Sequence, residues 1–357
     1  MPAKQTTPPV NTAVVKMDPC IRSSENVIAY SFHPTEPRIV IAHAENQGKE
    51  ISLSAYDTIT GKSVGYSTRG IHSFAHKYPY LGIYQIADSN RVITCGSDGK
   101  IHQYDLHPNT PSPNFKEPTR APKRLGMCKA SALSKDGKLL AIYNESNHHI
   151  QLWHLPEVKF SSSIPVSQED PGNWHATALA FSQDEKSIVA VGGNTNRNIN
   201  FVKAWNTDTL NSLGEQFHQS ADTYTSVITA GNKILAGTSQ GKIISVSTNG
   251  WLPLTGSTLG SALPFRADLF GRVNSLQLSP DSKSILCATE NKLYELETST
   301  GSTIRAPQFI NPGSLGAVFS NHGTQLISIH KNGLIYQRDP IHLTPKREAI
   351  QSPIELF

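Results

Sequence analysis

Few residue patterns in this chain have the spacing that catalysis requires. Gly237-Thr238-Ser239-Gln240-Gly241 matches G-x-S-x-G, in which a nucleophilic serine lies on a sharp turn between a strand and a helix. Here apolar runs at 233–236 and 243–246 flank the motif, so it joins two strands. We therefore interpret this segment as a hairpin turn and predict no catalytic role for its serine.

The histidines do not predict a metal site. His72 and His76 are four residues apart, and His102 and His107 are five apart. Zinc ligands at such spacing normally lie on a helix beside acidic partners, whereas these histidines fall in a loop and at a strand end. The glycine loops that cradle phosphates, G-x-x-x-x-G-K-[ST] and G-x-G-x-x-G, do not occur. We expect no metal ion and no cofactor.

The composition is that of a globular chain rich in turns. Hydrophobic residues make up 37% of the 357 residues and charged residues 17%, which argues against disorder. The 25 glycines and 23 prolines favour short strands, and no segment shows a sustained helical pattern of apolar residues. The net charge of +4 is small, so it permits a polyanionic partner without indicating one.

Several features favour a cytoplasmic or nuclear protein. No apolar run approaches the roughly 20 residues of a membrane span, and residues 1–10 lack the apolar centre of a signal peptide. The four cysteines are far apart and form no C-x-x-C pair, which favours buried thiols in a reducing compartment over a disulfide framework.

One unit recurs along the chain: an apolar strand, a polar turn, a second apolar strand, an Asn/Gly turn and a third strand. The clearest copy runs from Cys128 to His154 and has its polar turn at Ser134–Lys138. The ends of the third strands recur every 41 to 52 residues, a spacing typical of propeller repeats. These ends are Asp57, Asp105, His154, Asn206, Ser247, Glu297 and Asp339.

Seven such units predict an all-β fold, a single seven-bladed β-propeller with four-stranded antiparallel blades. A small sheet cannot bury both of its faces alone, whereas sheets stacked around an axis bury each face on a neighbour. We expect a flexible N-terminal arm at 1–11, the propeller at 12–350 and a tail at 351–357. Thr12–Met17 is expected to close the ring as the outer strand of the last blade, and Arg347–Ile354 is the competing segment.

The units resemble the repeats of the WD-repeat (WD40-like) family, and the resemblance covers about residues 26–340. It implies the propeller fold and a ring closed by a strand from outside the repeats. The chain departs from the family in having no strict Gly-His or Trp-Asp dipeptide, so the family's hydrogen-bond network is not carried over; Asp98 and Tyr104 are its best-matched pair. The resemblance rests on Ser279–Lys283, Ser134–Lys138, Ser97–Asp105, Trp153-His154 and Trp205-Asn206.

The loops that join successive blades are the predicted binding surface. They share one face with the turns between second and third strands, and they are long and irregular. Their aromatic and basic side chains are of the kind that interface hot spots favour. The competing interpretation is that these aromatics fold over the blade edges and cover the core. The candidates are Arg69, His72, Phe74, Tyr78, Lys123, Arg124, Trp174, Phe265, Arg266, Phe270 and Phe309.

These features together predict a non-catalytic scaffold or adaptor that binds a protein or peptide partner, as part of a multiprotein assembly. Nucleic acid is not the expected partner. Two alternatives stay open. A lactonase-like hydrolase would gather acidic and amide side chains around a metal ion in the central channel. A binder of polyanions would use the basic loop at 116–129, and its affinity would fall steeply with salt.

Overall fold

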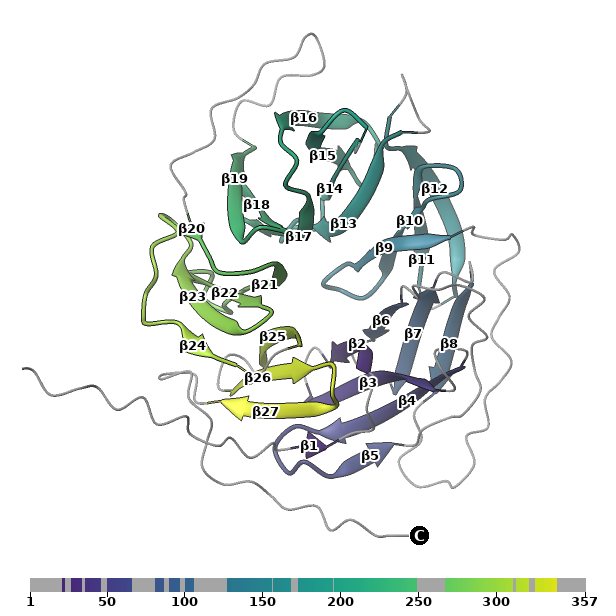
Figure 1. Ribbon diagram of the computed structural model, residues 1–357. Helices are drawn as coiled ribbons and strands as arrows, with labels where there is room; N and C mark the ends of the chain where they lie inside the picture. The colour runs from purple at the N-terminus through teal and green to yellow at the C-terminus, as the bar shows by residue number, and fades with distance from the viewer. Residues whose placement is uncertain are drawn as a thin grey trace, which may run out of the picture.

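The computed structural model confirms an all-β fold of seven small antiparallel sheets around a common axis (Figure 1). Six sheets have four strands, and the second has three within the described residues. No helix that could cross a membrane occurs in this part of the chain. The structure describes residues 21–22, 27–33, 36–45, 50–65, 81–86, 90–96, 100–105, 127–155, 157–167, 173–194, 196–248, 267–310, 313–320 and 325–338.

In the first six blades the strands follow chain order from the axis outward. Their bounds are β2 (Val27–Phe32), β3 (Arg38–Glu45), β4 (Glu50–Asp57), β5 (Ser63–Gly65); β6 (Leu81–Gln85), β7 (Arg91–Gly96), β8 (Ile101–Asp105); β9 (Cys128–Leu133), β10 (Leu139–Asn144), β11 (His149–His154), β12 (Lys159–Pro165); β13 (His175–Phe181), β14 (Ser187–Asn194), β15 (Ile199–Asn206), β16 (Ser212–Gln219); β17 (Tyr224–Ala230), β18 (Lys233–Thr238), β19 (Lys242–Ser247), β20 (Ala267–Asp268); and β21 (Val273–Leu278), β22 (Ser284–Thr289), β23 (Lys292–Glu297), β24 (Gln308–Phe309). Six of the seven predicted third-strand ends coincide with the observed ones.

The seventh blade is closed by a strand from the other end of the sequence. It contains β25 (Ser314–Ser320), β26 (Gln325–His330) and β27 (Leu334–Arg338), and its outer strand is β1 (Ile21–Arg22). Ile21 lies opposite Ile335 in the antiparallel β1–β27 pair. Closure from the N-terminal side is as expected, but the strand position was predicted wrongly, and Thr12–Met17 lies outside the described residues. Short apolar stretches occur at both ends of the sequence, and their composition alone does not show which one pairs with β27.

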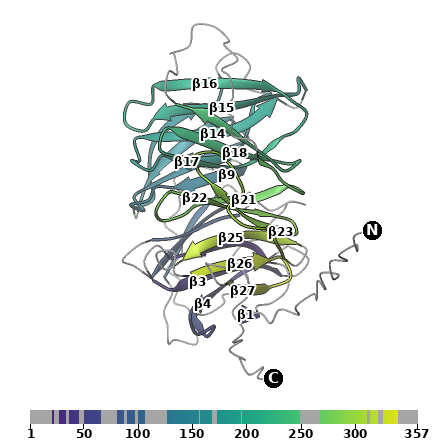
Figure 2. The ribbon, with the colours of Figure 1, turned by 90° about the vertical axis from the view of Figure 1, so that its left-hand side faces the viewer.

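Hydrophobic packing is organised between blades. The buried apolar residues form seven clusters, and each cluster combines residues of two neighbouring blades. The second and third strands supply most of them, and Ile41, Ile93 and Phe201 are fully buried. Turned by 90°, the ring is seen from its edge, with β16 and β1 on opposite sides (Figure 2). The predicted mutual burial of blade faces is therefore confirmed.

Polar side chains of the innermost strands connect neighbouring blades. They hydrogen-bond across the gap between one inner strand and the next, at distances of 2.6 to 3.1 Å. A hydrogen bond of this kind contributes about 1 kcal/mol and helps to fix the spacing of the strands. These bonds join Gln85 to Ser31, Tyr84 to Ser131, Thr229 to Phe181, Thr225 to Val273, and Asn274 to Ser314.

The turns between first and second strands of blades three, four and six share one hydrogen-bond pattern. In blade six the Ser279 hydroxyl donates to Asp281 Oδ1 (2.7 Å) and accepts the Ser284 N–H (2.9 Å). Asp281 Oδ1 also accepts the Lys283 N–H (3.1 Å). The same bonds occur in the turns 134–138 and 182–186.

Deleting residues 1–22 removes β1 and is expected to lower the melting temperature, because β27 loses its outer partner. The shift should be about 1–2 °C for each kcal/mol lost, because the unfolding entropy of a 357-residue chain is large. Calorimetry of the full chain and the deletion measures it. A second deletion, of residues 341–357, removes the competing segment. If that deletion lowers the melting temperature and the first does not, closure by β1 is contradicted.

The turn carboxylates predict an acid-sensitive contribution to stability. The serine hydroxyl and a backbone N–H lower the pKa of Asp184 and of Asp281. A lowered folded-state pKa stabilises the fold above the unfolded value, and this contribution is lost as the pH falls through the folded value. We expect the double variant Asp184→Asn/Asp281→Asn to lose less melting temperature than wild type between about pH 5 and pH 2. Parallel slopes in thermal melts would contradict this, since all other carboxylates are common to both proteins.

Candidate interaction surface

Three of the eleven candidate residues lie in the described part of the chain. Phe270 and Phe309 come together on the face formed by inter-blade loops and second-to-third-strand turns, and Trp174 lies elsewhere, between blades three and four. The remaining candidates lie outside the described residues: Arg69, His72, Phe74, Tyr78, Lys123, Arg124, Phe265 and Arg266.

Phe270 and Phe309 are the most exposed of the large hydrophobic side chains that the structure describes, at 71% and 69%. Phe270 follows β20 in the loop between blades five and six, and Phe309 in β24 pairs with Lys292 at the start of β23. Lys292 Nζ lies 4.3 Å from the centre of the Phe270 ring and 4.8 Å from that of Phe309. Both distances are within the range of cation–π attraction. We call these three residues the Phe–Lys–Phe cluster.

Buried contacts hold the backbone beneath this cluster. The N–H of the buried Leu269 donates to the Gly241 carbonyl (2.7 Å), and the Phe270 N–H donates to the Tyr294 hydroxyl (3.0 Å). Gly241 has a φ of +88°, and a Cβ there would lie 2.2 Å from the Leu269 carbonyl oxygen. Only glycine therefore allows this approach. A loop fixed in this way loses little conformational entropy when a partner binds.

The G-x-S-x-G segment is the hairpin between β18 and β19, as predicted. Its serine hydroxyl, Ser239 Oγ, donates to Asp222 Oδ1 at 2.8 Å. Asp222 Oδ1 also accepts the Gln240 N–H (3.0 Å), so the carboxylate holds the turn. The strand-to-helix turn that positions a serine nucleophile does not occur here.

Trp174 packs in the core, which agrees with the competing interpretation for that residue. Trp174 is 8% exposed, and its ring contacts the rings of Phe201 and Phe217 at centroid distances of 5.8 and 5.4 Å. Lys203 Nζ lies 5.3 to 5.8 Å from the centres of all three rings. Glu215 Oε2 accepts from this ammonium at 2.8 Å. The result is a lysine surrounded by aromatic rings and paired with a carboxylate.

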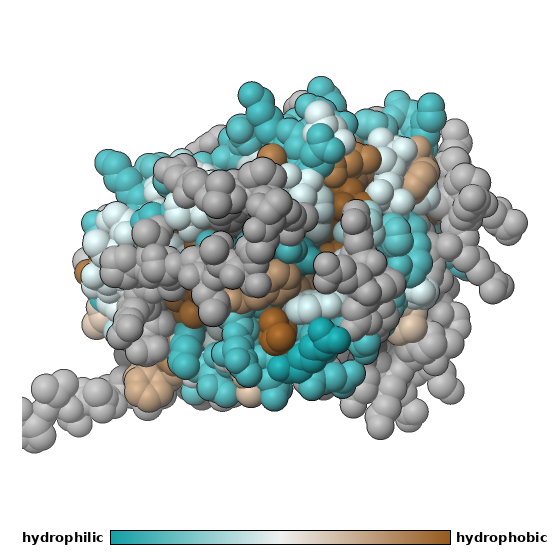
Figure 3. All heavy atoms as spheres, turned by 90° about the horizontal axis from the view of Figure 1, so that it is seen from above, coloured by the Kyte–Doolittle hydropathy of each residue, from teal (hydrophilic) through white to brown (hydrophobic). Residues whose placement is uncertain are grey.

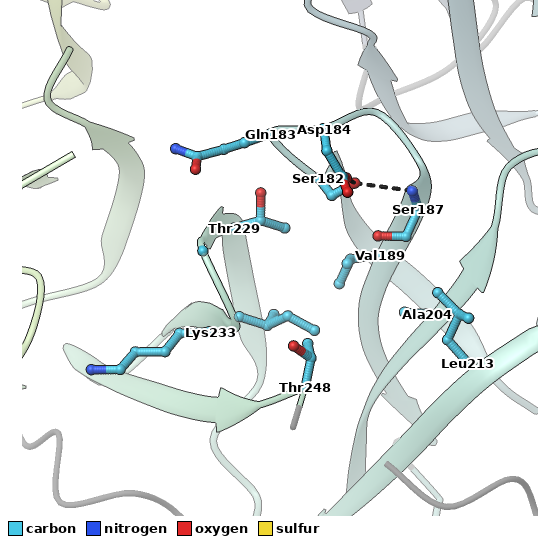
Figure 4. A pocket seen from close by; sticks show the side chains of 12 residues that line it. Ser182, Gln183, Asp184, Ser187, Val189, Ala204, Leu213, Thr229, Lys233 and Thr248 are labelled. Carbon is cyan, nitrogen blue, oxygen red and sulfur yellow. Dashed lines mark hydrogen bonds between the residues drawn. The ribbon is translucent and has the colours of Figure 1, made fainter. Parts of the chain in front are cut away.

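A groove of about 540 Å³ lies between blades four and five, on the face of the first-to-second-strand turns (Figure 4). It exists because the turn of blade five has only two residues, 231–232, whereas that of blade four takes 182–186. Apolar side chains such as Val189 and Ile234 line it together with hydroxyls. Seen from above, the coloured residues on this side of the ring are mostly hydrophilic, with apolar residues among them (Figure 3).

The ionisable side chains that line this groove make hydrogen bonds within the fold. Its only ionisable lining residues are Asp184 and Lys233, and the Lys233 ammonium donates to the Ser299 carbonyl (2.8 Å). No histidine or cysteine belongs to the lining. The Asp184 carboxylate accepts from the Ser182 hydroxyl (2.6 Å) and from the Lys186 N–H (3.2 Å), so it holds the turn 182–186.

His102 and the three cysteines of the described residues are buried. His102 is buried and stacks on Tyr104. Cys95 and Cys128 are buried thiols whose sulfurs lie 4.0 Å apart between blades two and three, and Cys287 is also buried. Within the described residues no three His, Cys, Asp or Glu side chains gather in a way that could hold a metal ion.

Comparisons with known proteins support the fold and nothing finer. No family model matches the chain, and no curated protein matches it. Solved structures match widely, with 1592 chains, and a fold so common does not indicate one function. One of them is the computationally designed Ika8 protein, which is 17% identical with a TM-score of 0.62. That match covers 92% of this chain and 89% of the designed one.

The lysine in the core offers a stability test. We expect Glu215→Gln to cost about 2–4 kcal/mol of unfolding free energy, because it leaves the Lys203 ammonium buried without a countercharge. The double variant Lys203→Met/Glu215→Gln should recover much of this loss, since methionine can keep the aromatic contacts without a charge. Guanidinium denaturation measures both. Equal losses of unfolding free energy in the single and double variants would show that the unpaired charge of Lys203 is not the cause of the destabilisation.

Proposed function

We propose that this protein is a non-catalytic scaffold that binds a protein or peptide partner on the face carrying the Phe–Lys–Phe cluster. The observation that carries the proposal is the exposure of two phenylalanine rings on a fixed backbone. Clustered apolar side chains in water are unfavourable, and in monomeric proteins such patches mark sites of interaction. Aromatic residues on a rigid support also contribute most to binding energy at interfaces.

The ring is suited to a scaffold role because each blade packs against its two neighbours. Each blade shares hydrophobic clusters with its neighbours, and the inner strands are joined by hydrogen bonds. Loops displayed on such a frame keep a fixed geometry, which lowers the entropic cost of binding. The resemblance to WD-repeat proteins, and a place in a larger assembly, belong to the same proposal. No feature of the described residues favours the hydrolase or the polyanion binder over it.

Substituting both exposed rings tests the proposal. We expect Phe270→Ser/Phe309→Ser to lower partner recovery at least about tenfold, because truncating hot-spot aromatics commonly costs 2 kcal/mol or more. The measurement is quantitative affinity capture with the tagged full chain from cells that produce the protein. The melting temperature should stay close to that of wild type, since surface substitutions are usually within about 0.5 kcal/mol.

Ile304→Ser is the matched control for this variant. Ile304 is 48% exposed on the same blade, in the connection between β23 and β24, and makes no contact with the cluster among the contacts described. It should keep wild-type recovery. Undiminished capture by the double phenylalanine variant would refute the proposed surface.

A further inference from the structure

We infer that the partner segment bound at the Phe–Lys–Phe cluster is an acidic peptide. A carboxylate of the peptide pairs with Lys292, and its neighbouring apolar side chains cover the rings of Phe270 and Phe309. This inference rests on the proposed function and adds the chemistry of the partner to it.

The Lys292 ammonium is positioned to receive an anion. Within the described residues it makes no hydrogen bond and no ion pair, and its contacts are the two aromatic rings. The rings remove water from part of the ammonium, so an arriving carboxylate interacts with it more strongly than in bulk solvent. A charge-assisted hydrogen bond of this kind is about twice as strong as a neutral one.

A second lysine in the same chain shows the completed arrangement. Lys203 lies among the rings of Trp174, Phe201 and Phe217, and Glu215 supplies the carboxylate at 2.8 Å. Lys292 has the aromatic surroundings but no carboxylate from the described residues. A carboxylate of the partner would pair with Lys292 at the surface as the Glu215 carboxylate pairs with Lys203 in the core.

The charges around the cluster favour an acidic partner. The turns and inter-blade loops on this face of blades five to seven carry four cationic side chains and two carboxylates, counted over the described side chains. Such an excess attracts acidic segments and speeds their association. The cations are Lys242, Arg272, Lys292 and Lys331, and the carboxylates are Glu290 and Asp222, of which Asp222 is buried and bound to Ser239.

A peptide fits this surface better than a single-stranded nucleic acid. Nucleic acids bind such sites by stacking bases on the faces of aromatic rings. Here Lys292 lies over one face of each ring, so those faces are not available for stacking. The net charge of +4 over 357 residues is also small for a nucleic-acid-binding protein. The remaining ring surfaces can contact leucine, phenylalanine or similar side chains.

Peptide display on the full chain tests the inference. A phage library of random 16-residue peptides is selected on the wild-type protein, after depletion on Phe270→Ser/Phe309→Ser. We expect the enriched peptides to carry Asp or Glu within a few residues of Phe, Leu or Trp. A library that yields no enriched peptide, or peptides without acidic residues, overturns the inference.

The affinity of an enriched peptide for variants of Lys292, measured by fluorescence anisotropy, then tests the contribution of the lysine charge. We expect Lys292→Met to weaken binding about tenfold, Lys292→Glu about a hundredfold, and Lys292→Arg by less than about threefold, with weaker binding at high salt. Unchanged binding by Lys292→Met overturns the acidic partner. If the double phenylalanine variant still loses binding in that case, the proposed function stands.

A 16-nucleotide single-stranded RNA is the competing probe in the same assay. Weak or undetectable binding of the RNA supports the inference. RNA binding as tight as that of the peptide, and sensitive to Lys292→Met, overturns it in favour of a nucleic acid.

Discussion

Each small sheet in this ring has two apolar faces, and a neighbouring sheet is what covers them. The seven hydrophobic clusters each combine residues of two adjacent blades. Burial of apolar surface at about 25 cal/mol per Å² therefore stabilises blades in pairs and not one at a time. For this reason a strand as short as β1 matters: it completes the one blade whose strands come from both sides of the sequence.

The same constraint leaves the loops as the part of the molecule that can differ without disturbing the core. The close approach of Gly241 to Leu269 and the bond from Phe270 to Tyr294 tie one such loop to blades five and six. The exposed rings thus stand on backbone that the core holds in place. The proposed binding surface combines a backbone that the core holds in place with exposed side chains that contribute little to the core.

The sequence predicted the ring well because its signals are local and repeated. Alternating strands and Ser-x-Asp-x-Lys turns recur in order, and an Asx-type turn forms the same hydrogen bonds wherever it occurs. Of the three residues of the proposed site, the sequence analysis named Phe270 and Phe309 but not Lys292. Trp174 and Phe270 look alike in sequence, as aromatics in inter-blade loops, and burial alone separates them. Lys292 was missed because its contacts arise from the β23–β24 pairing and from a loop of the preceding blade.

The pairing of β1 with β27 has a consequence for synthesis on the ribosome. Ile21 is among the earliest residues of the described chain to emerge, and its partner Ile335 among the last. Until Ile335 has emerged, blade one of the nascent chain lacks the seventh blade that covers one of its apolar faces. Exposed apolar surface of this kind is prone to aggregation. Such long-range closure slows folding. A chaperone that shields incomplete rings during translation would therefore raise the yield of this protein more than one acting after release.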